Sequence, residues 1–263
     1  MLVLRSLAFN ALYYANLIAW MIVALPTLVL PRGAFREVAR AWAHSSLWLL
    51  RVVAGTRVSW RGLGNIPPGG LLVASKHQSL WETFALLTIL DDPAYVLKRE
   101  LMWIPVFGWY AWKARSVPVN RKGRSAALAE LAVKAEEALA TGRQVILFPE
   151  GTRRQPGAEP AYKWGIVHLY DRLGAPVLPI ALNSGVYWPR RKFLRRPGTI
   201  VVEVLPPILP GKPKEVFFAE LQETIEAASN RLLAEGRGEL VQEGMPQPAD
   251  ERPGAPLDGR HGG

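Results

Sequence analysis

"LLVASKHQSLWETFALLTIL", residues 71–90, changes its apolar pattern about a quarter of the way along. Leu71 to Ser75 form a short apolar run, which is typical of a buried strand. From Leu80 onward the residues favour a helix, and the Asp-Asp-Pro that follows Leu90 predicts where it ends. A strand that leads directly into a helix is the repeating unit of α/β proteins. The segment therefore predicts one such unit.

The same alternation continues along most of the chain, which predicts an α/β fold with a mostly parallel central sheet flanked by helices. From Gly236 the chain is rich in proline, glycine and charge, which predicts a disordered tail. We expect an N-terminal element (1–56), an α/β domain (57–236) and the tail (237–263). The other predicted strands are "TRVSWRG" (56–62), "AYVLKR" (94–99), "ARSVPVNR" (114–121), "QVILFPEG" (144–151), "APVLPIALN" (175–183) and "TIVVEVLPPI" (199–208), and the other helices lie in 124–142, 163–174 and 213–236.

The N-terminal element has the composition of a membrane anchor. No charged residue occurs between Arg5 and Arg32, and this stretch is long enough to span a bilayer. Pro26 would kink or end its helix, and a second, basic-edged helix is expected up to Gly55. The element could span the membrane, lie as a helical pair in one leaflet, or be a buried soluble helix. The arginines that follow it predict that the rest of the chain lies on the cytoplasmic side of the membrane.

Composition narrows the possible chemistry. The chain has 263 residues, no cysteine, ten tryptophans and a formal net charge of +10. The absence of cysteine excludes cysteine nucleophiles, disulfides and thiolate metal sites. No G-x-S-x-G elbow and no cluster of metal ligands is visible in the sequence, so we expect no bound metal. The positive charge indicates an anionic partner, and tryptophan with arginine fits a lipid interface at least as well as nucleic acid.

His77 and Glu82 are five residues apart at the predicted strand-to-helix turn, and two interpretations compete. Ser79 and Glu82 match the capping box S-x-x-E, which needs no histidine. Alternatively, a carboxylate in the first helical turn reaches back to the imidazole, fixes its tautomer and leaves the other nitrogen free as a base. The residues alone leave both interpretations open.

Three further stretches combine basic residues with apolar or aromatic ones. In "LFPEGTRRQPG" (147–157), Gly151 permits an unusual backbone angle and Arg153 suits phosphate, although a surface turn with an ion pair is equally consistent. "KRELMWIPVFGWYAWKARSVPVNRKGR" (98–124) is a lipid-facing segment or a core helix, and its Arg121 could hold a phosphate. "WPRRKFLRRPG" (188–198) attracts anionic headgroups or is a solvated basic loop.

Four of these segments together resemble a known family. "KHQSLWE", "FGWYAWKARSVPVNR", "FPEGTR" and "VLPIALN" are similar, in order and spacing, to the four blocks of the glycerolipid acyltransferases. The similarity covers about residues 60–207 and is greatest to the bacterial enzymes that acylate 1-acyl-glycerol-3-phosphate. It implies a membrane-held enzyme with an N-terminal two-helix element and no enzyme nucleophile.

The resemblance also implies roles for individual residues. His77 matches the base that takes the proton of the acceptor hydroxyl, and Glu82 stands where the family usually has an orienting aspartate. We expect the His77 bond to prevail over the capping box. Lys76 stands where the family often has asparagine and could contact phosphate. The remaining substrate-binding residues implied are Arg121, Glu150, Gly151, Thr152 and Arg153 for the acceptor and Pro179 near the acyl donor.

The activity implied is transfer of a fatty acyl group from an acyl thioester to lysophosphatidic acid, which gives phosphatidic acid for phospholipid synthesis. Acyl-CoA or acyl-carrier protein would be the co-substrate, with no other cofactor. Alternatives are the same transfer to another lysolipid such as lyso-ornithine lipid, a non-catalytic membrane-binding protein, and an esterase that uses water. The anchor makes nucleic acid the least expected partner.

Overall fold

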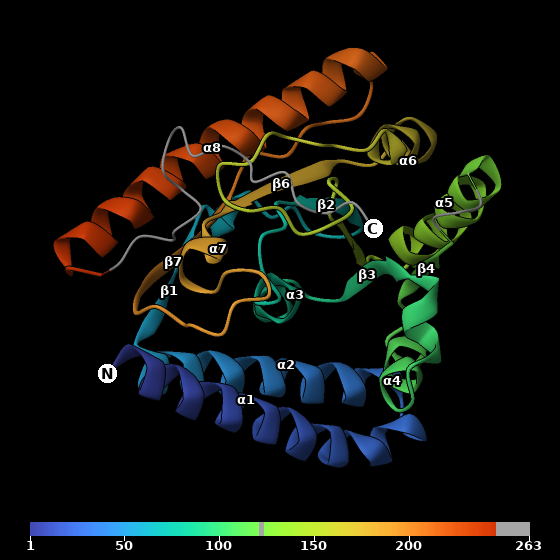
Figure 1. The fold of residues 1–263 in the computed structure, drawn as a ribbon. Coiled ribbons are helices and arrows are strands. Elements are labelled where there is room, and N and C mark those ends of the chain that lie inside the picture. The colour runs from blue at the N-terminus through green and yellow to red at the C-terminus, as the bar shows by residue number, and fades with distance from the viewer. Residues whose placement is uncertain (121–123, 246–263) are drawn as a thin grey trace, which may run out of the picture.

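A seven-stranded sheet forms the centre of the computed structural model, which describes residues 1–120 and 124–245 (Figure 1). The strand order is β1-β7-β6-β2-β5-β3-β4. Neighbouring strands are parallel except β6 and β7, which are antiparallel, so the prediction of a mostly parallel sheet is confirmed. The strands are β1 (Thr56–Arg61), β2 (Leu71–Ser75), β3 (Pro93–Lys98), β4 (Val117–Val119), β5 (Gln144–Leu147), β6 (Val177–Leu182) and β7 (Gly198–Val204).

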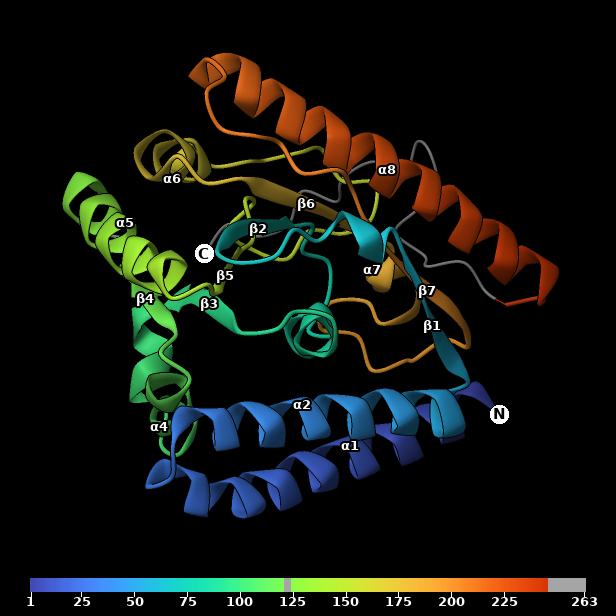
Figure 2. The same ribbon diagram turned by 180° about the vertical axis from the view of Figure 1, so that it is seen from behind.

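Helices cover both faces of the sheet. The first two helices and α3 lie on one side, and α5, α6 and α8 lie on the other, as Figure 2 shows from behind. The helices are α1 (Leu2–Ala24), α2 (Arg32–Leu49), α3 (Glu82–Ala85), α4 (Phe107–Lys113), α5 (Arg124–Ala140), α6 (Gly165–Leu173), α7 (Ser184–Tyr187) and α8 (Lys214–Gln242).

Alternation along β2 explains the two cores. Leu71 and Val73 belong to the core shared with α1, α2 and α3, whereas Leu72 and Ala74 belong to the core under α5, α6 and α8. All four are fully buried. Successive side chains of a strand point to opposite faces, so a strand buried on both faces is apolar throughout. This is why β2 reads as an uninterrupted apolar run.

The two N-terminal helices form an antiparallel pair that packs against the sheet domain (Figure 1). Pro26 lies in a short 3-10 turn, Leu25–Leu28, directly after α1, as the sequence predicted. Asn16 of α1 donates hydrogen bonds to the hydroxyls of Ser45 and Ser46 of α2. Phe9 is fully buried in the same core as the sheet. The N-terminal pair therefore contributes to the core instead of being only an appendage.

Two helix boundaries differ from the prediction. The helix after His77 was expected to reach Leu90, but α3 ends at Ala85 and a 3-10 turn, Leu86–Thr88, follows. The last helix was expected to end at Gly236, but it continues to Gln242 because Leu240 is fully buried in the core. Gly236 instead allows close approach, since a Cβ there would lie 3.1 Å from the Tyr187 hydroxyl. Residues 246–263 of the predicted tail lie outside the described residues.

Candidate active site

The polar side chains of the site gather at the carboxyl ends of three adjacent strands. β2 lies between β5 and β6, and all three run parallel. His77 follows the end of β2, Glu150 follows β5 and Ser184 follows β6. The carboxyl ends of neighbouring parallel strands meet at one edge of the sheet, where α/β proteins bind ligands. The strand order therefore brings residues from three parts of the chain together.

His77 and Glu82 form a hydrogen-bonded pair. Nδ1 of His77 lies 2.9 Å from Oε1 of Glu82, whose carboxylate is fully buried. That carboxylate also accepts backbone N–H bonds and a hydroxyl bond, and an ionised carboxylate can only accept. Nδ1 must therefore donate its proton to Glu82, which leaves the lone pair of Nε2 free to take a proton.

The pair interpretation is correct, whereas the capping box forms only in part, because Trp81 and not Ser79 is the N-cap of α3. Oε1 of Glu82 accepts the backbone N–H groups of Gln78 and Ser79, each at 2.7 Å, while it also binds His77. The Ser79 hydroxyl accepts the N–H of Trp81 at 3.2 Å. Our expectation that the two bonds would compete was wrong, because one oxygen meets all three donors where the chain turns into α3.

The imidazole of His77 is restrained by an aromatic ring on its face as well as by the hydrogen bond at its edge. Phe148 stacks on His77 with ring centroids 3.9 Å apart and planes inclined by 16°. The side chain of His77 remains 12% exposed, whereas that of Glu82 is fully buried. The histidine is thus packed firmly but keeps access to a bound molecule, which is the arrangement that a general base requires.

Lys76 and Glu150 are turned into the interior, and their predicted contact with substrate stays a prediction. Nζ of Lys76 lies 3.0 Å from Glu150 and 2.6 Å from Glu226 of α8, and its side chain is 3% exposed. The Tyr162 hydroxyl also donates to Glu226. Burial, with Glu226 adding to it, raises the pKa of Glu150, and Lys76 offsets only part of this. The buried charges of Lys76, Glu150 and Glu226 thus link β2, the loop after β5 and α8 next to His77.

The loop after β5 lies beside the His77 backbone. Gly151 has a φ of +67°, in the left-handed region that favours glycine, as the sequence predicted. The N–H of Arg154 donates to the carbonyl of His77 at 2.8 Å. Thr152 is exposed and Arg153 is partly exposed at this edge. The acceptor-binding role of Gly151, Thr152 and Arg153 stays a prediction.

Two other predicted site residues are not part of this edge. Pro179 is buried within β6, opposite Ala74 of β2, and its expected place near the acyl donor stays a prediction. Arg121 lies outside the described residues, so its role stays a prediction. Among the residues that the structure describes, no group of three or more His, Cys, Asp or Glu side chains is placed to hold a metal ion.

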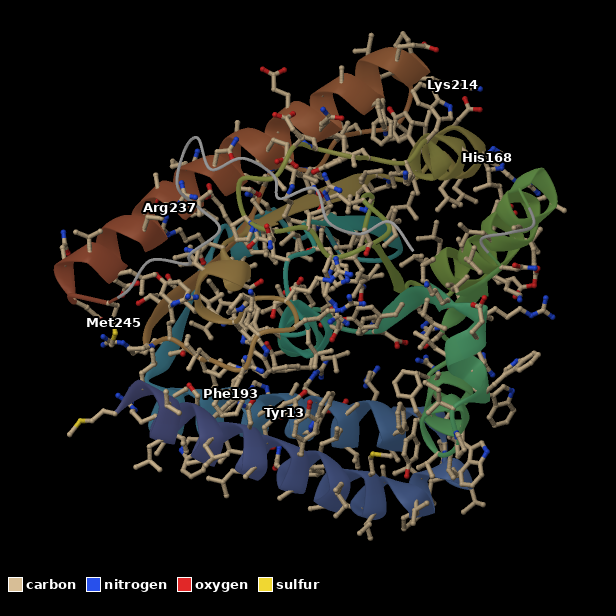
Figure 3. The ribbon with its side chains drawn as sticks, in the orientation of Figure 1. Tyr13, His168, Phe193, Lys214, Arg237 and Met245 are labelled. Atoms are coloured by element: carbon tan, nitrogen blue, oxygen red, sulfur yellow. The ribbon has the colours of Figure 1, made fainter. Side chains whose placement is uncertain are left out.

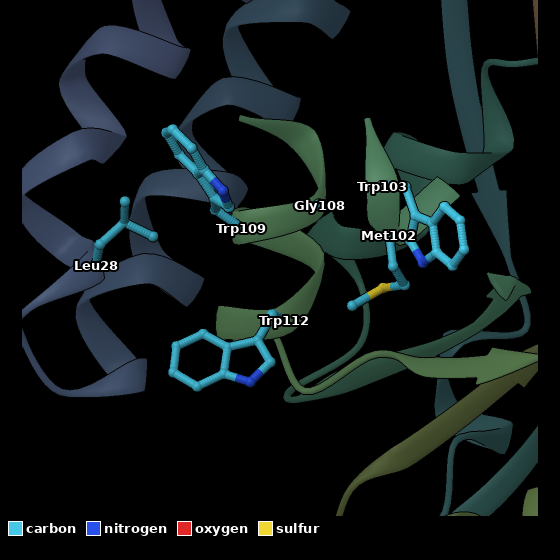
Figure 4. Close-up of a pocket in the computed structure, with 6 residues that line it drawn as sticks. All are labelled: Leu28, Met102, Trp103, Gly108, Trp109 and Trp112. Atoms are coloured by element: carbon cyan, nitrogen blue, oxygen red, sulfur yellow. The ribbon is translucent and has the colours of Figure 1, made fainter. Parts of the chain in front are cut away.

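The aromatic segment exposes three tryptophan side chains and buries other residues, such as Tyr110 and Ala111. Trp103 is 80% exposed, Trp112 is 69% exposed and Trp109 is 54% exposed. With Leu28 and Met102 these residues line a shallow hollow beside the end of α1 (Figure 4). Large apolar side chains gathered at a surface mark a site of interaction.

The basic loop 188–198 is only in part a charged surface. The side chains of Arg195 and Arg196 are almost fully buried, and Arg195 stacks on Trp188 at 4.6 Å. Asn10 of α1 donates to the carbonyl of Phe193, which lies over α1 in Figure 3. The loop therefore attaches the sheet domain to α1, while Arg191 and Lys192 remain exposed and its predicted interaction with headgroups stays a prediction.

Sequence reasoning missed four residues that complete the site, namely Gln78, Phe148, Ser184 and Glu226. Ser184 carries a usable signal, because it is the first hydroxyl after a predicted buried strand next to β2. Phe148 likewise follows directly on β5. Glu226 carries no such signal, since it lies in the middle of a long helix.

Comparison with known proteins identifies the class. Residues 57–183 match the family model described as "Acyltransferase". A 1-acyl-sn-glycerol-3-phosphate acyltransferase of Pseudomonas aeruginosa is 38% identical over 88% of this chain and 91% of its own length. The mouse 1-acyl-sn-glycerol-3-phosphate acyltransferase alpha is 32% identical over 59% of this chain and 55% of its own length.

A solved structure has the same fold. The crystal structure of the 1-acyl-sn-glycerophosphate (LPA) acyltransferase PlsC from Thermotoga maritima matches with a TM-score of 0.73 and 22% identity. The match covers 89% of this chain and all of that one. The fold, the His–Glu pair and these relatives define an acyltransferase. The chain belongs to the family of the 1-acyl-sn-glycerol-3-phosphate acyltransferases.

Proposed function

We propose that the protein transfers a fatty acyl group from an acyl thioester to the free hydroxyl of 1-acyl-glycerol-3-phosphate and so forms phosphatidic acid. The observation that carries this proposal is the His77–Glu82 pair, whose Nε2 is free at the carboxyl edge of the sheet. The names of the relatives support the acceptor. As donor we propose acyl-CoA or acyl-carrier protein, with no further cofactor.

Direct attack by the acceptor accounts for the residues present. Nε2 of His77 takes the proton of the acceptor hydroxyl as its oxygen bonds to the thioester carbonyl carbon. The carbon–sulfur bond then breaks, and the imidazolium returns the proton to the leaving thiolate. Glu82 stabilises the imidazolium through Nδ1 and keeps the ring oriented. The chain contains no cysteine, and this route needs no nucleophile from the enzyme.

The loop 148–154 is the proposed seat of the acceptor phosphate. Its link from Arg154 N–H to the His77 carbonyl keeps the loop beside the base. Arg153 is partly exposed there, and its planar guanidinium suits a phosphate. The carbonyl of Arg153 accepts a bond from Arg190, which restrains the loop further. A phosphate held here would place the rest of the acceptor close to Nε2.

We propose that α1 lies flat in one leaflet of the bacterial inner membrane, on the cytoplasmic side. By length and composition Leu2–Leu28 could cross a bilayer. However, Ser6 near its start accepts the N–H of Arg195, and the carbonyl of Met21 near its end accepts the Tyr110 hydroxyl. A spanning helix would carry one of these ends across the membrane. Contact of both ends with the same domain supports an in-plane helix.

Acyl transfer by the purified, detergent-solubilised protein tests the proposal. Wild type should convert lysophosphatidic acid to phosphatidic acid with at least one of the two thioester donors. His77→Ala should lower the rate by a factor of about 10² or more, as expected for a general base. Glu82→Gln should lower it as well.

Three outcomes would contradict the proposal. Equal activity of His77→Ala would remove the base from the mechanism and favour a membrane-binding role. Release of fatty acid without transfer would indicate an esterase. Transfer only to another lysolipid, such as lyso-ornithine lipid, would keep the chemistry and change the acceptor.

A further inference from the structure

The second oxygen of Glu82 has its own partner. Whereas Oε1 meets His77 and two backbone N–H groups, Oε2 accepts the hydroxyl of Ser184 at 2.8 Å. Ser184 is fully buried, and it lies 102 residues away in the sequence. We propose that Ser184 is a positioning residue that sets the plane of the Glu82 carboxylate and through it the orientation of His77. This inference rests on the proposed function.

A glutamate needs such a second restraint. The last torsion of its side chain is broad, so the covalent geometry leaves the carboxylate plane free to rotate. The bonds to Oε1 fix the position of one oxygen but allow the group to pivot about it. A donor on Oε2 removes that freedom. Without the Ser184 hydroxyl, the buried Oε2 would lack a hydrogen-bond donor, which is unfavourable and favours rotation of the carboxylate.

The position of Ser184 is itself determined by the fold. β6 pairs with β2, and Ser184 begins α7 two residues after β6 ends. The next residue, Gly185, donates its N–H to the side chain of Gln78 at 3.0 Å. Gln78 in turn donates its own N–H to Glu82. The turns after β2 and β6 are thus joined by two hydrogen bonds, Ser184 to Glu82 and Gly185 to Gln78, which close a ring. The Ser184 contact is therefore fixed by the fold.

The length of the glutamate side chain makes the proposal specific. An aspartate at position 82 would withdraw the carboxylate by about one carbon–carbon bond, roughly 1.5 Å. It could not keep the His77 contact and the Ser184 contact together, because both are already at hydrogen-bond distance. The contribution of Ser184 should therefore depend on the residue at position 82.

Steady-state acyl transfer with substitutions at position 184 tests this inference. Ser184→Ala should lower kcat about tenfold, on the scale of one hydrogen bond to a charged group, with the KM for the acceptor within about twofold of wild type. Ser184→Cys keeps the size and a weak donor, and should be intermediate. Ser229→Ala is the matched control, because the buried Ser229 hydroxyl has no hydrogen-bond partner among the described residues. It should behave as wild type.

A double substitution separates positioning from mere packing. In a Glu82→Asp background, Ser184→Ala should change kcat by less than about twofold, because the shorter carboxylate has already lost this contact. Full multiplication of the two losses would overturn the proposal. So would wild-type kinetics of Ser184→Ala, or a rise in KM without a change in kcat.

A measurement that does not use activity keeps the two proposals distinguishable. The chain has four histidines, so the ¹⁵N signals of His77 can be assigned with a His77→Gln variant. Near neutral pH, wild type should show the Nδ1–H tautomer, and Ser184→Ala a mixture of tautomers. An inactive wild type with this change would refute the proposed function alone. An unchanged tautomer would refute the positioning role alone.

Discussion

Lys76 carries its charge into the interior, where two carboxylates meet its ammonium group. Glu150 comes from the loop after β5 and Glu226 comes from α8, so the cluster connects distant parts of the chain. A buried ion pair adds little net stability, but loss of one partner leaves an uncompensated buried charge. Removing Lys76 would leave two carboxylates facing each other beneath His77.

We therefore predict that Lys76→Met lowers the free energy of unfolding by about 3–5 kcal/mol. Urea unfolding in detergent measures this. The control is Lys134→Met, which breaks a partly exposed ion pair with Glu130 within α5 and should cost no more than about 0.5 kcal/mol. Wild-type stability of Lys76→Met would show that the cluster does not hold the site together.

At the scale of elements, two arginines attach α2 to the sheet domain. Arg32 forms a two-pronged ion pair with Asp92 at 2.5 Å. Arg40 donates to the carbonyls of Leu87, Leu90 and Asp91 at the end of the segment that begins with α3. These carbonyls are left unpaired where the helical segment ends, so α2 completes them. Helix α2 is therefore bonded directly to the helical segment that carries Glu82.

The Arg32–Asp92 pair predicts a pH dependence of stability. Burial alone would raise the pKa of Asp92, but the bond from Arg32 and the charge of Arg143 outweigh it and lower the pKa. Because the pKa is lowered on folding, ionised Asp92 stabilises the folded state at pH values above the ordinary aspartate pKa of about 3.9. This stabilisation is lost as the pH falls from that value through the lowered pKa of the folded state. Asp92→Asn should thus lower the unfolding temperature at pH 7 and weaken its fall below about pH 4.

Thermal unfolding followed between pH 7 and pH 3 tests this prediction. Asp91→Asn is a suitable control, because Asp91 is exposed next to Asp92 and should keep the wild-type profile. An Asp92→Asn profile parallel to that of wild type would assign the acid sensitivity to other carboxylates.

At the scale of the whole molecule, one side of the protein is apolar over a long distance. The outer face of α1 continues into the tryptophans of α4 and of the 3-10 helix Arg99–Trp103 that precedes it, around the hollow of Figure 4. The chain also has a net charge of +10, which favours anionic lipid. The large apolar residues more than half exposed along α1 are Val3, Leu4, Leu7, Tyr14, Ile18, Ile22 and Val23.

This surface predicts the effect of removing its tryptophans. The double change Trp109→Ala and Trp112→Ala should weaken binding to anionic vesicles about tenfold or more, since each buried aromatic side chain contributes about 1.5–3 kcal/mol. Co-sedimentation with vesicles measures this, and added salt should weaken binding further. Trp164→Ala is the matched control, because Trp164 is 49% exposed but precedes α6 on the opposite side. Equal loss in both would indicate non-specific destabilisation.

Local sequence patterns determined the strands and most helices, and β2 and α5 follow from periodicity. For His77 and Glu82 the pattern only placed both side chains at one turn, and the pair itself was expected from the resemblance to the acyltransferase family. The apolar composition of α1 is likewise visible in the sequence. These features depend on residues that are close together in the sequence, so they can be predicted without knowing the fold.

Only the tertiary structure decided which distant residues complete the site. Lys76 meets Glu226 across 150 residues, and Glu82 meets Ser184 across 102. These contacts exist because β2 lies between β5 and β6, and strand order is set by the packing of the whole sheet. For the same reason Lys76, Glu150 and Pro179 could not be placed inside or outside from their motifs. A motif specifies which side chains are present, whereas the packing around them decides which way each side chain faces.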